Sequence, residues 1–265
     1  MPAFYFGEPA RSLFGVWHEP PRAVAAPRAL VVCAPLWQEA IRAHRVLRQL
    51  AVRLAKEGFS VLRFDYSGAG DSAGATEHGD VDVWLGDVAA AVEEAKRGKG
   101  IAHVTLLGLR FGATLAALTA ARREDVGRLV LWEPVAEGAR YLEAGFAAQR
   151  AWRDSYATWR RLPPAEVSDG GDEILGFRVT EAMRRSIAAV ELAHLPRTAP
   201  RALVIERAAP DGADRLDASL AAHGTRVDHE VLAEAEVWKQ HQVEGTAGAR
   251  QTQDFIVAWL SRSEP

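Results

Sequence analysis

The 265-residue chain alternates between two hydrophobic patterns. Short runs of aliphatic, aromatic and β-branched residues predict buried strands, whereas stretches with an apolar residue every three or four positions predict amphipathic helices. Because strands and helices take turns along the chain, the pattern predicts an α/β fold with a mostly parallel sheet and helices on both faces. The expected strands are 13–17, 29–33, 60–66, 104–109, 129–132, 202–205 and 227–232, and the expected helices are 44–56, 81–96, 111–122, about 214–223 and about 246–260.

This alternation lapses between residues 137 and 200 and then resumes. A stretch of that kind inside one sheet pattern is typical of an insertion over the sheet, so we expect a helical lid at 137–200 within a single domain covering 1–265. Two helix ends carry signals of their own. Gly58 is placed to end the helix before it, and Asp80 or Asp82 is placed to cap the next one.

Composition narrows the possible partners. Charged residues make up 25% of the chain, the net charge is −3 and the pI is about 6.3, with no basic block, which argues against a nucleic-acid partner. The single cysteine, Cys33, excludes a disulfide within the chain and a thiolate metal cluster, and its strand setting favours a buried structural thiol. We expect no metal or cofactor, no membrane span and, with no signal peptide visible, a cytoplasmic protein.

One segment carries chemical information beyond its periodicity. The strand at 104–109 runs into Gly108-Leu109-Arg110-Phe111-Gly112 and directly on into a helix rich in small residues. A Gly-x-Ser-x-Gly sequence in this setting forms a nucleophile elbow, in which crowded backbone at a sharp strand-to-helix turn requires the two glycines. Here the central residue is Arg110 where an elbow would have serine.

Two further segments support this interpretation. Asp65-Tyr66-Ser67-Gly68-Ala69-Gly70-Asp71-Ser72 resembles the Asp-x-x-Gly-x-Gly-x-Ser turn of α/β-hydrolases, and Ala34-Pro35-Leu36-Trp37 stands where those proteins supply one amide of an oxyanion hole. The chain therefore resembles the α/β-hydrolase superfamily over essentially its whole length. That resemblance implies an eight-stranded, mostly parallel sheet with helices on both faces and a helical lid.

Within the superfamily, the chain resembles the hydrolase-like proteins associated with exosortase A systems, a bacterial sorting and exopolysaccharide machinery. The residues that carry this resemblance include Gly-Leu-Arg-Phe-Gly at the elbow and the segments after the next strand, in the lid and near the end of the chain. These segments are Leu131-Trp132-Glu133-Pro134-Val135 with Gly138 and Tyr141, Leu175-Gly176-Phe177, and Val237-Trp238-Lys239-Gln240.

Replacing serine by Arg110 removes the acyl-enzyme route. A guanidinium has five donors and no accessible lone pair, so it can be neither nucleophile nor base. The remaining triad members are only partly recognisable. His241 is the histidine in the expected position after the last strand, and Asp211, with Asp214 as the alternative, is the expected acid. An exposed loop histidine and a surface acid explain these residues about equally well.

Arg110 has two possible roles. It stands at a helix N-terminus, beside the expected oxyanion-hole amides of Phe111 and of Leu36 or Trp37, and could bind an anion there. Alternatively, Arg110 pairs internally with Asp65, Glu39 or Glu133 and fills the pocket in which a catalytic serine would act. Trp132 is expected in the pocket wall, as are the further tryptophans Trp37, Trp152, Trp159 and Trp238.

Some nearby polar residues have simpler explanations. Ser67 and Ser72 are better explained as turn residues than as nucleophiles, and Arg42, His44 and Arg45 as residues that cap and solvate a helix than as ligand-binding residues. Three functions stay open. The chain binds a small anionic or acyl ligand, or a protein partner, without catalysis; it is a hydrolase or lyase that uses no acyl-serine; or it is a scaffold with a closed pocket.

Overall fold

The computed structural model describes residues 3–22, 24, 26–98, 100–160, 172–195, 198–207, 213–239 and 248–262. An eight-stranded sheet runs through it in the order β1-β2-β4-β3-β5-β6-β9-β10. The six strands β4, β3, β5, β6, β9 and β10 are parallel to one another, which confirms the predicted mostly parallel sheet. At the other edge, β2 is antiparallel to both of its neighbours, β1 and β4. The strands are β1 (Ala3–Phe6), β2 (Leu13–His18), β3 (Arg28–Cys33), β4 (Phe59–Phe64), β5 (Val104–Leu109), β6 (Val126–Trp132), β9 (Arg201–Glu206) and β10 (Arg226–Val231).

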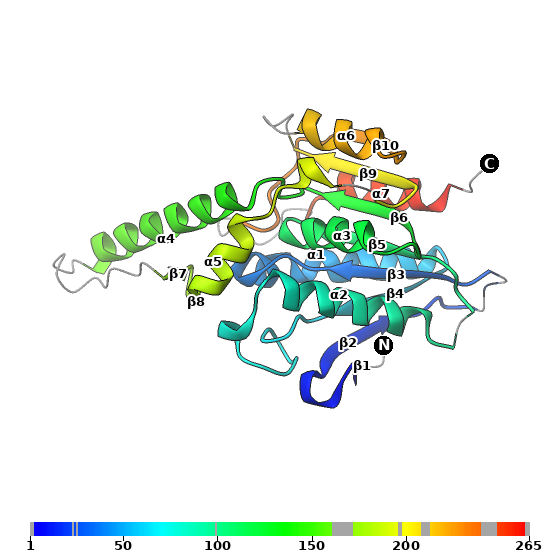
Figure 1. The fold of residues 1–265 in the computed structure, drawn as a ribbon, viewed down its shortest axis with the longest axis horizontal. Helices are drawn as coiled ribbons and strands as arrows, with labels where there is room; N and C mark the ends of the chain where they lie inside the picture. The colour runs from blue at the N-terminus through cyan, green and yellow to red at the C-terminus, as the bar shows by residue number, and fades with distance from the viewer. Residues whose placement is uncertain are drawn as a thin grey trace.

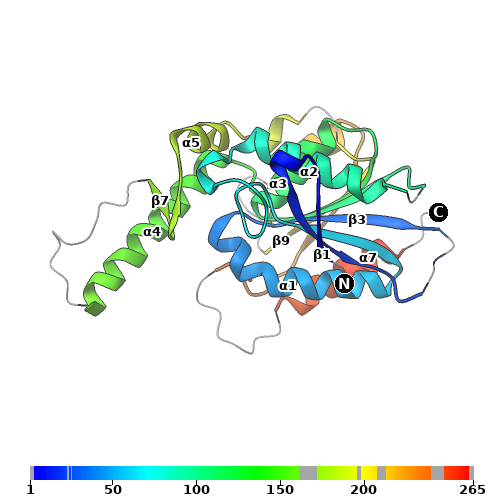
Figure 2. The same ribbon diagram turned by 90° about the horizontal axis from the view of Figure 1, so that it is seen from below.

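Helices cover both faces of this sheet (Figures 1 and 2). One face is covered by α1 (Trp37–Lys56) and α7 (Arg250–Ser261), and the other by α2 (Val81–Lys96), α3 (Phe111–Ala121) and α6 (Ala213–Ala222). Alternate side chains of each strand enter opposite core clusters. Leu106, for example, packs with α2 and α3, and its neighbour Leu107 packs with α1 and α7.

The segment between β6 and β9 projects from the body. It contains α4 (Gly138–Arg160), the short strands β7 (Glu173–Ile174) and β8 (Phe177–Arg178), and α5 (Glu181–Ala188). Figure 1 shows the far half of α4 extending well away from the sheet. Within the described residues, no helix is long and apolar enough to cross a membrane.

Several boundaries differ from the sequence prediction. Helix α1 begins at Trp37 rather than at residue 44, and β1 was not predicted. The early start has a local cause, because Trp37 has φ of +53° and turns the chain into the helix directly after Leu36. The residues predicted to cap or to end a helix agree with the structure more closely than these boundaries do. Asp80, not Asp82, caps α2 by accepting the Val83 N–H at 2.8 Å, and Gly58 has φ of +90° after α1.

The turn between β5 and α3 is packed so tightly that only glycine fits on either side. A Cβ on Gly108 would lie 2.3 Å from the Ala113 Cα, and a Cβ on Gly112 would lie 2.2 Å from the Cys33 carbonyl oxygen. Both neighbours are backbone atoms, which cannot rotate away. Close approach of α3 to the ends of β3 and β5 therefore explains the two glycines of the motif.

We expect Gly112→Ala to lower the free energy of unfolding by about 3 kcal/mol or more, because the added methyl group must displace backbone. The matched control is Gly86→Ala, an exposed position of α2 where an added Cβ meets no atom within 4 Å. There the higher helix propensity of alanine should raise stability by about 0.5–1 kcal/mol. Urea unfolding of both variants is the measurement, and equal effects at the two positions would contradict this account.

Candidate functional site

Arg110 occupies the sharp turn between β5 and α3. Its backbone has φ of +55° and ψ of −127°, a conformation that residues other than glycine rarely adopt. The Arg110 N–H donates to the Trp132 carbonyl at 2.9 Å, which ties the turn to the end of β6. The side chain at this position is therefore presented at the carboxyl edge of the parallel strands, where open α/β sheets bind ligands.

Glu39, in the first turn of α1, pairs with the Arg110 guanidinium. Arg110 Nε donates to Glu39 Oε1 at 3.2 Å, and the Tyr141 hydroxyl donates to Glu39 Oε2 at 3.1 Å. The two charged side chains are only 22% and 19% exposed. Burial raises the pKa of Glu39 although Arg110 opposes that shift. Burial alone would lower the pKa of Arg110, but the charge and hydrogen bond of Glu39, together with Tyr141 and Glu133, raise it. The pair is thus a partly buried, hydrogen-bonded unit.

Aromatic rings hold this unit in place. Trp37 stacks on Tyr141 with centroids 6.3 Å apart, Tyr141 packs on Phe111 at 5.3 Å, and Trp84 meets both Phe111 and Trp37 edge-on. We call Trp37, Trp84, Phe111 and Tyr141 the aromatic cluster. On another side, the guanidinium carbon of Arg110 lies 5.0 Å from the centroid of the Trp238 ring, close enough for a cation–π contact.

Of the three carboxylates proposed from the sequence as partners of Arg110, Glu39 is the one that pairs. Glu133 follows β6 with φ of +49° and is near enough for Arg110 to oppose the rise that burial causes in its pKa. Asp65 instead accepts the Asp71 N–H at 3.1 Å within the turn after β4.

The two expected oxyanion-hole amides are those of Trp37 and Phe111, at the first positions of α1 and α3. In the described part of the chain, neither amide donates a hydrogen bond to another residue. The other two proposed binding residues, Leu36 and Trp132, are each 3% exposed, and Trp132 packs in the core cluster on the α1 and α7 face.

Other proposed residues fall elsewhere. His241 and Asp211 lie outside the described residues, and Asp214 lies in α6. Trp152 and Trp159 stand on the projecting half of α4 with 43% and 74% of their surface exposed, and neither is among the residues that contact Arg110 in the described part of the chain.

Ser67 and Ser72 take the turn roles expected for them. Ser67 Oγ donates to Asp87 Oδ1 at 2.8 Å, and Ser72 Oγ donates to the Asp65 carbonyl at 2.6 Å. Among the described residues, no group of three or more His, Cys, Asp or Glu side chains is placed to hold a metal ion.

Sequence reasoning missed one cluster of titratable groups. His229 of β10 lies between two carboxylates, with Nε2 2.9 Å from Glu206 Oε2 and Nδ1 2.9 Å from Asp217 Oδ2. Burial raises the pKa of Glu206, which ends β9. The sequence does not reveal this cluster, because Asp217, Glu206 and His229 lie in three different elements. The parallel pairing of β9 with β10 is what brings Glu206 and His229 together.

This architecture and turn define an α/β-hydrolase fold. Residues 25–203 match the family model described as serine aminopeptidase, S33, which covers more than half of the chain. The chain therefore belongs to that family. No curated protein sequence matches it.

Solved structures agree on the fold. Est1E from Butyrivibrio proteoclasticus with ferulic acid bound is 15% identical, with a TM-score of 0.63 over 98% of this chain and 96% of that one. Proline iminopeptidase from Mycobacterium smegmatis is 14% identical, with a TM-score of 0.65 over 98% and 97%. The enol-lactonase from Burkholderia xenovorans LB400 is 20% identical, with a TM-score of 0.61 over 97% and 100%. Identities this low show the shared fold alone.

Removing one partner of the ion pair should destabilise the protein. Glu39→Gln leaves the charge of Arg110 without its counter-ion, and we expect a loss of about 2–3 kcal/mol, near the low end for a buried pair because both side chains retain some exposure. The double variant Glu39→Gln, Arg110→Met should recover most of the loss. Urea unfolding of a double-mutant cycle measures the coupling, and additive effects would contradict the pairing.

Proposed function

We propose that this chain is a hydrolase-family protein that binds an acyl ligand at Arg110 instead of cleaving it through an acyl-serine. The observation that carries the proposal is the position of Arg110 in the sharp turn after β5, with its guanidinium held through Nε by Glu39. This contact fixes the side chain while leaving the two Nη groups without a hydrogen-bond partner among the described residues.

The chemistry of arginine argues against acyl transfer at this position. Loss of the serine from a catalytic triad lowers turnover about a millionfold and leaves roughly 10³–10⁴ over water from binding and the oxyanion hole. Arg110 supplies no lone pair to attack a carbonyl carbon. Its Nη groups are donors, and they can instead hold a carbonyl oxygen.

The electrostatics favour a neutral carbonyl over a free anion. Glu39 already compensates the charge of Arg110, and Glu133 adds a second carboxylate nearby. An ester, thioester or amide oxygen needs donors rather than net positive charge, and the N-terminus of α3 adds donors of that kind. In this proposal the amides of Phe111 and Trp37 share the oxygen with Arg110, and Leu36 and Trp132 belong to the apolar surround.

Two kinds of likeness support an acyl ligand. One neighbour in the fold is an enol-lactonase, and Est1E was solved with ferulic acid bound. We further propose, from the resemblance to exosortase A-associated proteins, that the chain works in the bacterial cytoplasm with a sorting and exopolysaccharide system. A ligand of that system carrying an acyl group would suit the site.

A closed scaffold is the second candidate, favoured by the same Glu39 pair, because an internal counter-ion also satisfies Arg110 without any ligand. The two differ in one property. A scaffold has no affinity for an acyl compound at Arg110, whereas a binding site does.

The test is binding of N-(4-nitrophenyl)butanamide, an acyl compound that resists hydrolysis, with butyrate as the anionic comparison. We expect the Glu39→Gln, Arg110→Met double variant to bind the amide about tenfold more weakly, because it loses charged donors without stranding a buried charge. The matched control is Arg178→Met, an arginine in an exposed pair on β8. Unchanged affinity in the double variant would refute the binding site, and tighter binding of butyrate than of the amide would refute the choice of ligand.

A further inference from the structure

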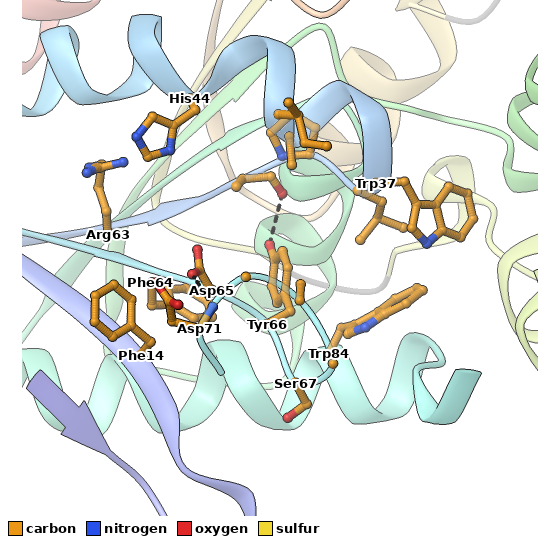
Figure 3. Close-up of a pocket in the computed structure, with 18 of the residues that line it drawn as sticks. Phe14, Trp37, His44, Arg63, Phe64, Asp65, Tyr66, Ser67, Asp71 and Trp84 are labelled. Carbon is orange, nitrogen blue, oxygen red and sulfur yellow. Dashed lines mark hydrogen bonds between the residues drawn. The ribbon is translucent and has the colours of Figure 1, made fainter. Parts of the chain in front are cut away.

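A cavity lies beside the Arg110 turn. It has a volume of about 790 Å³ and opens between α1 and the segment 65–71 that follows β4 (Figure 3). This volume is in the usual range for small-molecule sites. Its walls are largely apolar and include Phe14, Val32, Leu36, Leu47, Phe64 and Trp84.

The cavity borders the Arg110 site and shares Leu36 and Trp37 with it. Arg110 is not among its lining residues, and neither are Glu39 and Tyr141. Trp37 and Trp84, two members of the aromatic cluster, face the cavity and pack against Tyr141 and Phe111 on their other sides. The aromatic cluster therefore forms a wall between the two sites.

A cation lies at one end of this cavity. Arg63 of β4 is partly buried, and its Nε donates to His18 Nε2 at 3.0 Å. His18 must be neutral to accept this hydrogen bond, in agreement with a pKa lowered to about 4 by burial and by the charge of Arg63. Within the described residues, no carboxylate oxygen lies within 4.0 Å of the Arg63 guanidinium. The guanidinium fork thus has unused donors beside an apolar cavity.

His44 and Asp65 lie near Arg63 at the same end, as Figure 3 shows. The His44 ring has no hydrogen-bond partner in the described part of the chain. Asp65 is less available, since its Oδ2 accepts the Asp71 N–H and the carboxylate lies against Gly70, where a Cβ would be only 2.1 Å from Oδ2. Arg63 and His44 therefore offer donors at this end, beside the carboxylates of Asp65 and Asp71.

The cavity end carries charges of both signs. Arg63 and nearby Arg48 are opposed by Asp65 and Asp71, so the four formal charges sum to zero. A carboxylate would therefore be held by the donors that it contacts and not by a net positive field. A guanidinium fork matches the two oxygens of a carboxylate, and His44 can add a third donor. The aromatic and aliphatic walls suit a hydrocarbon body next to that head group.

We propose that this cavity binds an amphipathic carboxylate, with the carboxylate on Arg63 and His44 and the apolar body among Phe64, Leu47 and Trp84. The head-group residues of this site, Arg63 and His44, are distinct from Arg110 and Glu39, although Leu36 and Trp37 border both sites. It assigns to the chain a second ligand of different chemistry, an anion carried on an apolar chain.

The first test is calorimetric binding of decanoate to the full chain at about neutral pH. Arg63→Gln should weaken binding by about tenfold or more, the effect of losing hydrogen bonds to a charged group. The matched control is Arg48→Gln, an exposed arginine near Arg63 that does not line the cavity, and it should change affinity by less than about threefold. Equal effects of the two variants, or equal affinity for 1-decanol, would overturn the proposal.

A second variant separates this site from the Arg110 site. Ala40→Trp fills the cavity from α1 without altering a charge, and should reduce decanoate affinity at least tenfold while the melting temperature stays close to that of the wild type. The Glu39→Gln, Arg110→Met double variant should leave decanoate affinity unchanged. If instead the double variant abolishes binding and Ala40→Trp does not, decanoate binds at the Arg110 turn and the proposal is wrong.

Affinity should also depend on pH in a defined direction. The pKa of His44 is lowered, first by burial and then by Arg63 and Arg48, while Asp65 raises it. Burial raises the pKa of Asp65. Lowering the pH from about 8 to about 6 adds positive charge at His44, so decanoate should bind more tightly at the lower pH. His44→Gln should flatten this dependence, and a slope that persists in that variant would contradict the role of His44.

Discussion

The ion pair between Glu39 and Arg110 is the contact on which the site depends. It joins the first turn of α1 to the turn that begins α3, and Tyr141 from the start of α4 donates to the same carboxylate. A guanidinium at the buried turn would be costly without a counter-ion, so Glu39 permits the arginine to stand there. The aromatic cluster packs against the pair, and its four rings join the first turns of α1, α2, α3 and α4.

This arrangement keeps the framework of a hydrolase with an arginine at the centre of the turn. A strand–turn–helix site requires glycines such as those at 108 and 112 and a positive φ such as that of Arg110. The amides of Trp37 and Phe111 have no hydrogen-bond partner among the described residues. The central side chain is a donor instead of a nucleophile. Membership in the serine aminopeptidase S33 family therefore describes the fold and descent of the chain, while its reaction or ligand must be argued from the side chains at the turn.

The sequence predicted the sheet, its flanking helices and the turn at Arg110 because these depend on local periodicity and on glycines that close packing requires. It placed Glu39 among three possible partners but could not choose, since the choice depends on where α1 begins. The helix was expected from residue 44, which would have left Glu39 in a loop, whereas α1 begins at Trp37. The contacts of His229 with Glu206 and Asp217 depend on strand register and helix packing, which a one-dimensional pattern does not contain.

The most direct test of the central claim is the intact mass of the wild-type protein after incubation with p-nitrophenyl butyrate, with any adduct mapped by peptide digestion. A side chain that cannot attack a carbonyl forms no covalent intermediate, so the account predicts no butyryl group on the peptide that contains Arg110. A stoichiometric butyryl adduct on a residue of the Arg110 turn, formed with a burst of p-nitrophenol, would contradict the account and show that this turn performs acyl transfer.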